Sequence, residues 1–473
     1  MKTFLFYDIE TSGLNPVFDQ ILTFAAIRTD EAFRELERHT FTVRLRPDVV
    51  PCPGAFLTHR LTMEDLSGGI TEYDAALAVH RLVNEPETIS LGYNTLGFDD
   101  EFLRFTFYRN LLDPYTHQYA GGCGRMDILP VVTLYRIFKP DILNWPTIEG
   151  RPSLKLELIS SENKFKTSAR AHDAMADVEA TLALAKHLSL ETATWDYCLG
   201  FFHKKTDEAR VQEIPGSLIV GGESYRLGLM VSPSFGPDVM YMAPVLFLGH
   251  SSAYSNQGIW MRLDRDLSLL PGTGAADQLP VIRKRYGEAR FVLPARDRFW
   301  GRLTSAQRES CEKNIATMGR NAAWFDAAVR FHLDFSYPVI PDLDPDAALY
   351  QDGFFSFREK REMAGFHDLS LDDKINKYKA MRSLRIKTLA SRILFRNFPS
   401  CLDSLPDVNS DFNAYMARVR TSVPGMIIRG FRNDARYTCG DAARELDAIR
   451  QSGGLDEEQV VLLDALDDAI NRL

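Results

Sequence analysis

The sequence predicts an α/β domain at the start of the chain, β-rich sequence after it, and a helical C-terminal part. Strand-like and helix-like segments are interleaved up to about residue 190, and short apolar runs separated by Gly, Pro and Ser fill residues 215–270. Helical patterns dominate beyond about residue 346. The 473 residues suffice for two to four domains at roughly 100–200 residues each.

The first part opens with an apolar run that ends in two acids and is followed by a turn cluster, Thr11 to Pro16. Later runs are rich in β-branched and aromatic residues, which favour strands, and other segments have helical spacing of apolar side chains. We therefore predict strands at 3–10, 20–29, 40–46 and 88–94, and helices at 98–111, after an N-cap at Ser153, and at 173–188.

Further along, the pattern changes from strand to helix. A helix is predicted near 304–333, and the Pro- and Asp-rich stretch 338–345 is typical of a linker. The last helix is predicted to begin near Asp456, because apolar side chains from Leu462 to Leu473 then form one stripe.

Composition limits the cellular setting. The six cysteines include no CxxC pair, which argues against a zinc site and a disulfide framework. The N-terminal apolar run is too short for a signal peptide, and no apolar stretch approaches the ~20 residues of a membrane span. We expect a protein of the reducing cytoplasm with no membrane partner. The net charge of −9 argues weakly against nucleic acid, although a local basic groove can lie on an acidic protein.

Two acids at the end of the first predicted strand point to metal chemistry. Asp8 and Glu10 are two residues apart, so their side chains project from the same face of the strand. Two neighbouring carboxylates repel one another unless a cation lies between them. Taken alone, however, an Asp-x-Glu pair is more often two solvated acids near a turn.

Three more polar residues further along the chain are candidates for the same site. Asp99 lies at a strand-to-helix junction, and His172 and Asp177 lie near the start of the helix at 173–188. Five residues on an ideal helix turn through about 140°, so the two share a site only if His172 precedes the helix. Each residue alone has a structural explanation, such as an Asp at the positive end of a helix.

Together these residues resemble the three motifs of the DEDD exonuclease superfamily, in its His-containing branch. The strings Asp8–Gly13, Gly92–Asn94 with Phe98–Asp100, and Ala171–Val178 carry the resemblance. Further strings are similar to the bacterial exodeoxyribonuclease I family over nearly the whole chain, least clearly between about 200 and 340: Phe24–Asp30, Phe107–Asn110, Asn144–Pro146, Gly353–Phe355 and Arg396–Pro399.

The resemblance implies a fold and an activity. It implies a ribonuclease H-like exonuclease domain at 1–192, a β-rich SH3-like domain at 193–345 and an α-helical C-terminal domain at 346–473. The implied activity is 3′→5′ hydrolysis of single-stranded DNA to 5′-mononucleotides, in DNA repair and recombination. Asp8, Glu10 and Asp177 would hold two Mg²⁺ ions, with Mn²⁺ as the alternative, and Asp99 would be the fourth catalytic carboxylate. His172 would accept the proton of the attacking water, since its ordinary pKa is near 6.5.

The resemblance also implies binding residues. Glu10 and Thr11 would contact the terminal nucleotide, and Lys155 lies where the family has Arg. The remaining DNA contacts implied are Arg104, Tyr115 and Tyr119, although buried core aromatics are about as common. Two basic runs, 283–302 and 374–396, are candidates for groove walls, although such runs are usually solvated.

A protein partner is implied as well, the acidic, apolar-ended C-terminal tail of single-stranded DNA-binding protein. Lys139 and Tyr197 fall at family positions for this tail, and we look for further basic groups among Arg296, Arg298 and Arg302. Lys139 replaces a family Arg, and alternatively it only caps a helix C-terminus. The family resemblance implies a monomer.

Two other functions stay open. The chain could be another superfamily nuclease, a ribonuclease or a proofreading exonuclease, although the long C-terminal half argues against both. It could also be an inactive DNA-binding scaffold, although all five catalytic positions hold the expected residue types.

Overall fold

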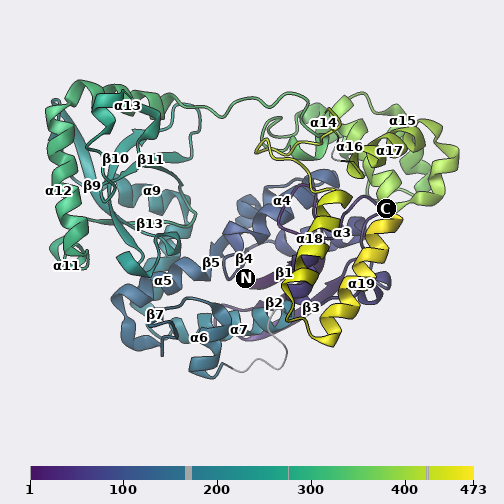
Figure 1. Ribbon diagram of the computed structural model, residues 1–473, viewed down its shortest axis with the longest axis horizontal. Helices are drawn as coiled ribbons and strands as arrows, with labels where there is room; N and C mark the ends of the chain where they lie inside the picture. Colours follow the sequence, from purple (N-terminus) through teal and green to yellow (C-terminus); the bar gives the residue numbers. More distant parts are fainter. Residues whose placement is uncertain (1, 166–172, 275, 422, 424) are drawn as a thin grey trace.

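The computed structural model describes residues 2–165, 173–274, 276–421, 423 and 425–473. We call residues 1–192 the N-terminal region, 193–345 the β-rich region and 346–473 the helical region. The N-terminal region lies below and between the other two, which stand at the left and the right in Figure 1. An extended segment crosses the top of the molecule from the β-rich to the helical region (Figure 1), as the predicted linker at 338–345 requires.

A five-stranded sheet forms the centre of the N-terminal region, in the order β3-β2-β1-β4-β5. The first three strands are antiparallel, and β4 and β5 run parallel to β1. The predicted strand at 40–46 is wrong in its bounds, because the edge strand starts earlier and carries charged residues that disguise it. The strands are β1 Thr3–Thr11, β2 Ile21–Thr29, β3 Glu35–Thr42, β4 Thr88–Gly92 and β5 Gly124–Asp127.

Helices cover both faces of this sheet. Phe4 and Phe6 of β1 pack on the side of α5 and α7, whereas Leu5, Tyr7 and Ile9 pack on the side of α3 and α4. The helices of this region are α1 Pro53–His59, α2 Met63–Ser67, α3 Glu72–Val83, α4 Asp99–Arg109, α5 Ile128–Phe138, α6 Leu156–Asn163 and α7 Ala174–Leu188.

The N-cap predicted at Ser153 is wrong. Lys155 is the N-cap residue of α6, and Ser153 lies in the preceding loop, where its hydroxyl accepts a hydrogen bond from the Lys155 amide at 3.3 Å. The backbone amide of Ser153 is bonded to the carbonyl of Pro146, 2.9 Å away, which keeps it outside the helix. A short ribbon, β6 Thr147–Ile148 with β7 Arg151–Pro152, lies just before it.

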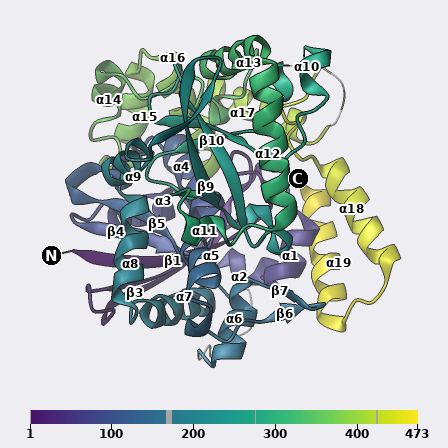
Figure 2. The same cartoon turned by 90° about the vertical axis from the view of Figure 1, so that its left-hand side faces the viewer.

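The β-rich region is a fully antiparallel sheet with two helices packed on it, α12 in front of β9 and β10 in Figure 2. The single helix predicted near 304–333 is wrong, because Asn321 has non-helical backbone angles and ends one helix where the next begins. The elements are α8 Thr192–Leu199, α9 Lys204–Gln212, β8 Gly216–Val220, β9 Glu223–Val231, β10 Met242–His250, β11 Gln257–Arg262, α10 Leu270–Thr273, β12 Val281–Arg285, β13 Phe291–Pro294, α11 Asp297–Trp300, α12 Ser305–Arg320 and α13 Ala322–Asp334.

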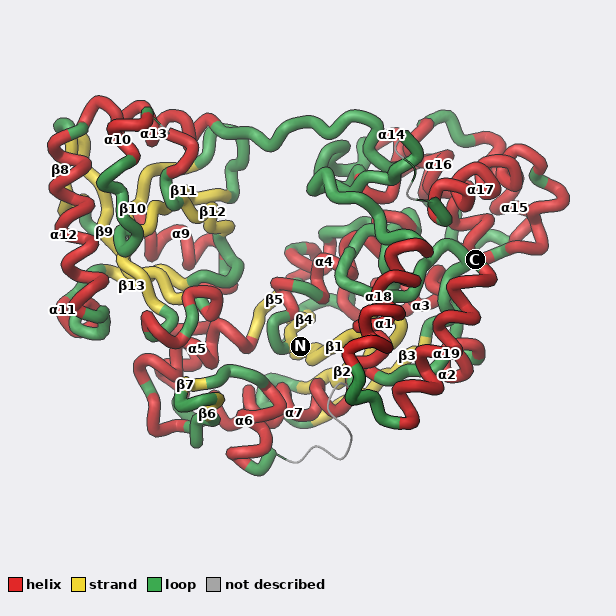
Figure 3. Tube along the Cα trace, viewed as in Figure 1, coloured by secondary structure: helices red, strands yellow, loops and turns green. Residues whose placement is uncertain are grey.

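Described residues beyond 346 are mainly helices and loops (Figure 3), as predicted. This region shares a core with the N-terminal region, because Phe18, Phe56 and Tyr108 belong to the same buried cluster as Ile393 and Leu466. The helices are α14 Phe357–Met363, α15 Leu371–Ala380, α16 Leu384–Asn397, α17 Pro406–Val419, α18 Cys439–Ser452 and α19 Glu457–Arg472. The last begins after Asp456, as predicted.

The α/β, then β-rich, then helical order is therefore confirmed, whereas domain boundaries at 192 and 345 stay a prediction. Among the described residues, no helix is both long and apolar enough to cross a membrane.

Candidate functional site

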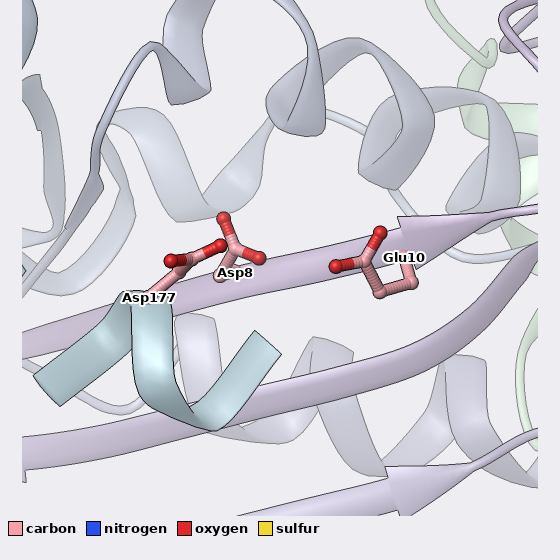
Figure 4. A group of neighbouring side chains, drawn as sticks. All are labelled: Asp8, Glu10 and Asp177. Carbon is pink, nitrogen blue, oxygen red and sulfur yellow. The ribbon is translucent and has the colours of Figure 1, made fainter. Parts of the chain in front are cut away.

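Three carboxylates meet where β1 faces α7. One carboxylate oxygen from each of Asp8, Glu10 and Asp177 lies within 4.8 Å of the others. Asp8 and Asp177 turn toward one another, and the carboxylate of Glu10 points back toward them along the strand (Figure 4). The three acids predicted as metal ligands thus lie together, and their role as ligands stays a prediction.

Local sequence explains this convergence. Asp8 and Glu10 alternate with buried Ile9, so they lie on the face of β1 that packs against α7. Their cross-strand partners on β2 are the small residues Ala25 and Thr23, which leave room beside the carboxylates. A register shift follows Glu10 and ends the regular strand.

Asp177 is held in place by the start of its helix. Asp173 caps α7 by accepting hydrogen bonds from the amides of Met175 and Ala176, at 3.0 and 3.2 Å. Asp177 lies in the first turn, where the helix dipole favours a negative charge. His172 lies outside the described residues, so its place relative to the carboxylates stays a prediction.

Asp99 approaches the same strand from α4. It is the first residue of the helix and it is buried. Burial raises the pKa of its carboxyl well above the ordinary value, and the backbone amide of Ile9, between the two acids of β1, acts in the opposite direction. The turn before it is fixed by Asp127, which accepts from the amides of Asn94 and Leu96 at 2.9 and 3.1 Å. Asp127 was missed from the sequence, because only the fold brings β5 beside this turn.

The site is electrostatically strained without a cation. Burial, then Asp99, Asp177 and Glu10, raise the pKa of Asp8 well above its ordinary value. Burial, followed by Asp177 and Asp99, raises the pKa of Glu10 to about 8. Oxygen ligands arranged in this way fit a hard divalent cation, whose charge would reverse these shifts.

Comparison with known proteins decides the family. Residues 5–185 match the family described as Exonuclease, and residues 343–472 match the Exonuclease I C-terminal domain. Exodeoxyribonuclease I of Escherichia coli K12 is 28% identical over 495 residues, covering 98% of this chain and 97% of its own length.

The chain belongs to the exodeoxyribonuclease I family.

Other comparisons agree. The Haemophilus influenzae exodeoxyribonuclease I is 36% identical over 187 residues, 39% of either chain. The E. coli Exonuclease I complex with a dA16 oligonucleotide matches with a TM-score of 0.83 at 28% identity, covering 100% of both chains. A zinc-bound E. coli ExoI–ssDNA complex matches with a TM-score of 0.84 at 28% identity, covering 100% of this chain and 99% of its own. The predicted enzyme class and fold class are therefore confirmed, and the exonuclease domain implies dependence on a divalent metal.

The predicted nucleotide contacts differ in accessibility. Thr11 is buried, and its hydroxyl donates to the carbonyl of Gly13 at 2.7 Å. Lys155 is exposed, with its ammonium 3.8 Å from a Glu157 carboxylate oxygen. Leu14, which the sequence prediction did not include, is 79% exposed in the turn after β1.

Arg104, Tyr115 and Tyr119 lie in three different settings. Arg104 is buried and paired with Asp100, at 2.7 Å, so its guanidinium is already occupied. Tyr115 packs edge-on against Phe354 with 5.1 Å between ring centroids. Tyr119 is 64% exposed and free to stack.

The two predicted tail-binding residues line one cavity of about 1000 Å³. The ammonium of Lys139 is paired with Glu191, and the guanidinium of Arg210 lies 4.2 Å from the ring centroid of Tyr197. Apolar side chains from α5 and β13 form part of its wall. The other basic residues of the lining are Arg296, Arg298 and Arg302, the ones considered from the sequence.

Some members of the two basic runs are buried and paired, so they cannot line a groove, and the role of the others stays a prediction. Lys284 is buried and bonded to Asp207 at 2.5 Å. Arg392 and Arg396 are buried against carboxylates, Arg396 2.8 Å from Asp48 of the N-terminal region. Exposed members such as Arg285 and Arg382 can still meet a ligand.

Proposed function

We propose that the protein removes nucleotides from the 3′ end of single-stranded DNA and releases 5′-mononucleotides. The observation that carries this proposal is the group of three acids, Asp8, Glu10 and Asp177, at the place where β1 meets α7 in an exodeoxyribonuclease I family member. The E. coli relative has been crystallised with single-stranded oligonucleotides, which supports the same substrate here.

The three acids would hold Mg²⁺, in two ions per site, with Mn²⁺ as the alternative. Carboxylate oxygen is the ligand that hard cations prefer, and when bound the ions would supply an activated water and neutralise charge on the phosphate. Asp99 would contribute the fourth carboxylate next to β1, and its effect on the pKa values of Asp8 and Glu10, both of which it raises, supports that role. His172 would take the proton from the attacking water.

The single-stranded DNA would contact Glu10, Thr11 and Lys155 with its 3′-terminal nucleotide. Nucleotides further toward the 5′ end would contact Tyr115 and Tyr119. The exposure of Lys155 and Tyr119 supports direct contacts, a point charge for phosphate and a ring for a base. Arg104 is buried among acids, which supports an indirect contribution to binding.

One set of assays separates this function from its rivals. Mononucleotide release is measured with Mg²⁺ on single-stranded DNA, on RNA of the same sequence, and on duplex DNA with either a paired or a mismatched primer terminus, with Asp8→Ala as the inactive control. We expect release from single-stranded DNA alone. Equal release from RNA indicates a ribonuclease, release from a mismatched primer terminus of duplex DNA indicates proofreading, and binding without release indicates a scaffold.

We further propose that the cavity at Lys139 and Tyr197 binds the C-terminal tail of single-stranded DNA-binding protein. Its basic residues suit a terminal carboxylate, and its apolar wall suits the last side chain of the tail. Because Glu191 already pairs with Lys139, the incoming carboxylate must compete with it.

This competition gives a sharp test by fluorescence anisotropy with a labelled tail peptide. Lys139→Ala and Tyr197→Ala should weaken binding, whereas Glu191→Gln should strengthen it, and added salt should weaken it. Lys186→Ala, in the last turn of α7, is the control and should change nothing. The nuclease activity on naked DNA should be the same for all variants. If the affinity for the peptide is unchanged in all three cavity variants, the tail does not bind in this cavity.

The setting we propose is DNA repair and recombination in the cytoplasm, with the protein as a monomer. All six cysteines are free thiols, which fits a reducing compartment. Light scattering of the purified protein tests the monomer directly.

A further inference from the structure

The first turn of α4 is tied to residues from the other two regions. Asp99, the proposed fourth carboxylate, is followed by Asp100, which is fully buried. Asp100 forms an ion pair with Arg104, at 2.7 Å, and accepts hydrogen bonds from the imidazole of His117, at 3.0 Å, and from Arg125. Four side chains thus form one buried cluster directly behind Asp99.

The β-rich region reaches this cluster through Glu288. Its carboxylate lies 3.1 Å from a guanidinium nitrogen of Arg125 and 3.8 Å from one of Arg104. Glu288 is in the loop between β12 and β13. Asp207 of α9 holds the start of this loop, because it accepts hydrogen bonds from the amide of Gly287, at 3.0 Å, and from the ammonium of Lys284 in β12, at 2.5 Å. The position of Glu288 is therefore fixed by its own region.

The helical region reaches the same turn through Tyr350. The Tyr350 hydroxyl donates to Glu101 at 2.7 Å and accepts from Arg104 at 3.2 Å. Its ring packs on Phe105 and Phe431, with centroids 5.5 and 5.2 Å away. In Figure 1, α4 accordingly lies between the β-rich and the helical region.

We propose that Glu288 and Tyr350 are positioning residues, which hold the first turn of α4 from opposite sides and so set the place of Asp99 against β1. The inference rests on the proposed role of Asp99 in the nuclease site. Neither residue touches the three-acid group, so each would act through Arg104, Arg125 and Glu101.

The charges of the cluster favour a stiff connection. Burial of Asp100 and Glu288 raises their pKa values, but the guanidinium groups of Arg104 and Arg125 outweigh this effect and lower the pKa of both carboxyls. Both acids are therefore ionised, Asp100 in the interior and Glu288 at its edge, and charge-assisted hydrogen bonds are strong and directional where solvent is excluded. Loss of one member lets the turn shift, and a displacement of about 1 Å can cost roughly 100-fold in rate.

The test separates positioning from DNA binding and from general stability. For Glu288→Gln, Tyr350→Phe and the double variant of the full-length protein, three quantities are compared with wild type. These are the single-turnover rate of release of a 3′-terminal fluorescent nucleotide from oligo(dT) with saturating enzyme and Mg²⁺, the Kd for the same oligonucleotide in EDTA, and the Tm. The controls are Glu223→Gln, at an exposed acid of β9, and Tyr337→Phe, at an exposed ring.

We expect each single variant to lower the single-turnover rate roughly 10- to 100-fold while the Kd stays unchanged. The double variant should lose less than the product of the two single losses, because both act on one network. A rise in Kd with an unchanged saturated rate would make the two residues DNA contacts, and a lower Tm with unchanged rate and Kd would make them structural; either overturns the proposal. If wild type itself releases no nucleotide from oligo(dT), the proposed function fails, and the positioning role fails with it.

Discussion

Removal of the Asp177 charge should stabilise the metal-free protein and destabilise the metal-bound protein relative to wild type. The change Asp177→Asn keeps the size of the side chain in the first turn of α7 but removes one of three carboxylates that lie within 4.8 Å of one another. Without a cation the three negative charges repel one another, so the loss of one charge stabilises the folded protein. With a cation bound, the carboxylates are its ligands, so the loss of one weakens metal binding and the stability that it adds.

The pKa of Glu10 gives the size and the pH window of the effect. Its pKa is raised from 4.5 to about 8, first by burial and then by Asp177. Below pH 4.5 the group is protonated whether the chain is folded or unfolded, so it costs nothing. As the pH rises from 4.5 to 8, the unfolded chain ionises more readily, and folded stability falls by up to about 5 kcal/mol. Since burial is the larger cause, we expect Asp177→Asn to recover about 1–2 kcal/mol of this cost at pH 8.

The assay is thermal unfolding at pH 8 and pH 5, in EDTA and in excess Mg²⁺. In EDTA at pH 8 the variant should melt a few degrees above wild type, and the difference should shrink at pH 5, where Glu10 stays protonated in the folded protein. In Mg²⁺ at 100 times its Kd, wild type gains about 2.7 kcal/mol and should melt above the variant. Asp196→Asn, at an exposed acid of α8, should follow wild type in every buffer. If Asp177→Asn melts below wild type in EDTA at pH 8, the repulsion argument is wrong.

Four further outcomes are expected, two for the nuclease activity and two for the stability of the fold. His172→Ala should lower kcat roughly 10²–10⁴-fold while Mg²⁺ binding measured by calorimetry persists, and a kcat at the wild-type level across pH 6–9 would contradict a general base. Affinity for single-stranded DNA should fall as salt rises, because Lys and Arg release condensed counterions, and blunt duplex should be digested more slowly; equal digestion rates would contradict the selectivity. Asp48→Asn removes one carboxylate partner from the buried guanidinium groups of Arg46 and Arg396. It should lower the free energy of unfolding in urea by about 3–5 kcal/mol, and an unchanged unfolding midpoint would contradict the importance of this network. The pKa of Glu72 is lowered to about 2, because Arg109 and Arg46 outweigh its burial, so the stability it adds above pH 4.5 should disappear as the pH falls from 4.5 to 2.

Local order in the sequence predicted the acids of the site. Period-two alternation placed Asp8 and Glu10 on one face, and helical spacing put Asp177 at the start of a helix, as the structure has them. What linked the acids to one another was the resemblance to known motifs, since Asp177 lies more than 160 residues beyond Glu10. Asp127 had no such motif, and its role in fixing the turn before Asp99 depends on the pairing of β4 with β5.

Charge was the property that the sequence described least well. Lys284 and Arg396 belong to basic runs, yet each is neutralised by an acid from a distant part of the chain: Asp207 is 77 residues from Lys284, and Asp48 is 348 residues from Arg396. A run of like charges shows where cations lie along the chain but not which of them are already paired. Only long-range packing decides that, and it decided against the groove interpretation for both residues.

The same packing separates acids that support the fold from acids that serve the site. Asp48 and Asp100 are buried more deeply than Asp8, yet guanidinium groups outweigh the effect of burial and hold the pKa of each below its ordinary value. Asp8 has acids for neighbours, and its pKa is raised. Asp127 accepts hydrogen bonds from backbone amides, and its pKa of about 6 is intermediate between the pKa values of these two kinds of acid. A buried acid with a guanidinium partner is already satisfied by the fold, whereas acids gathered beside one another repel and favour a cation, which is the physical argument for a metal site at the end of β1.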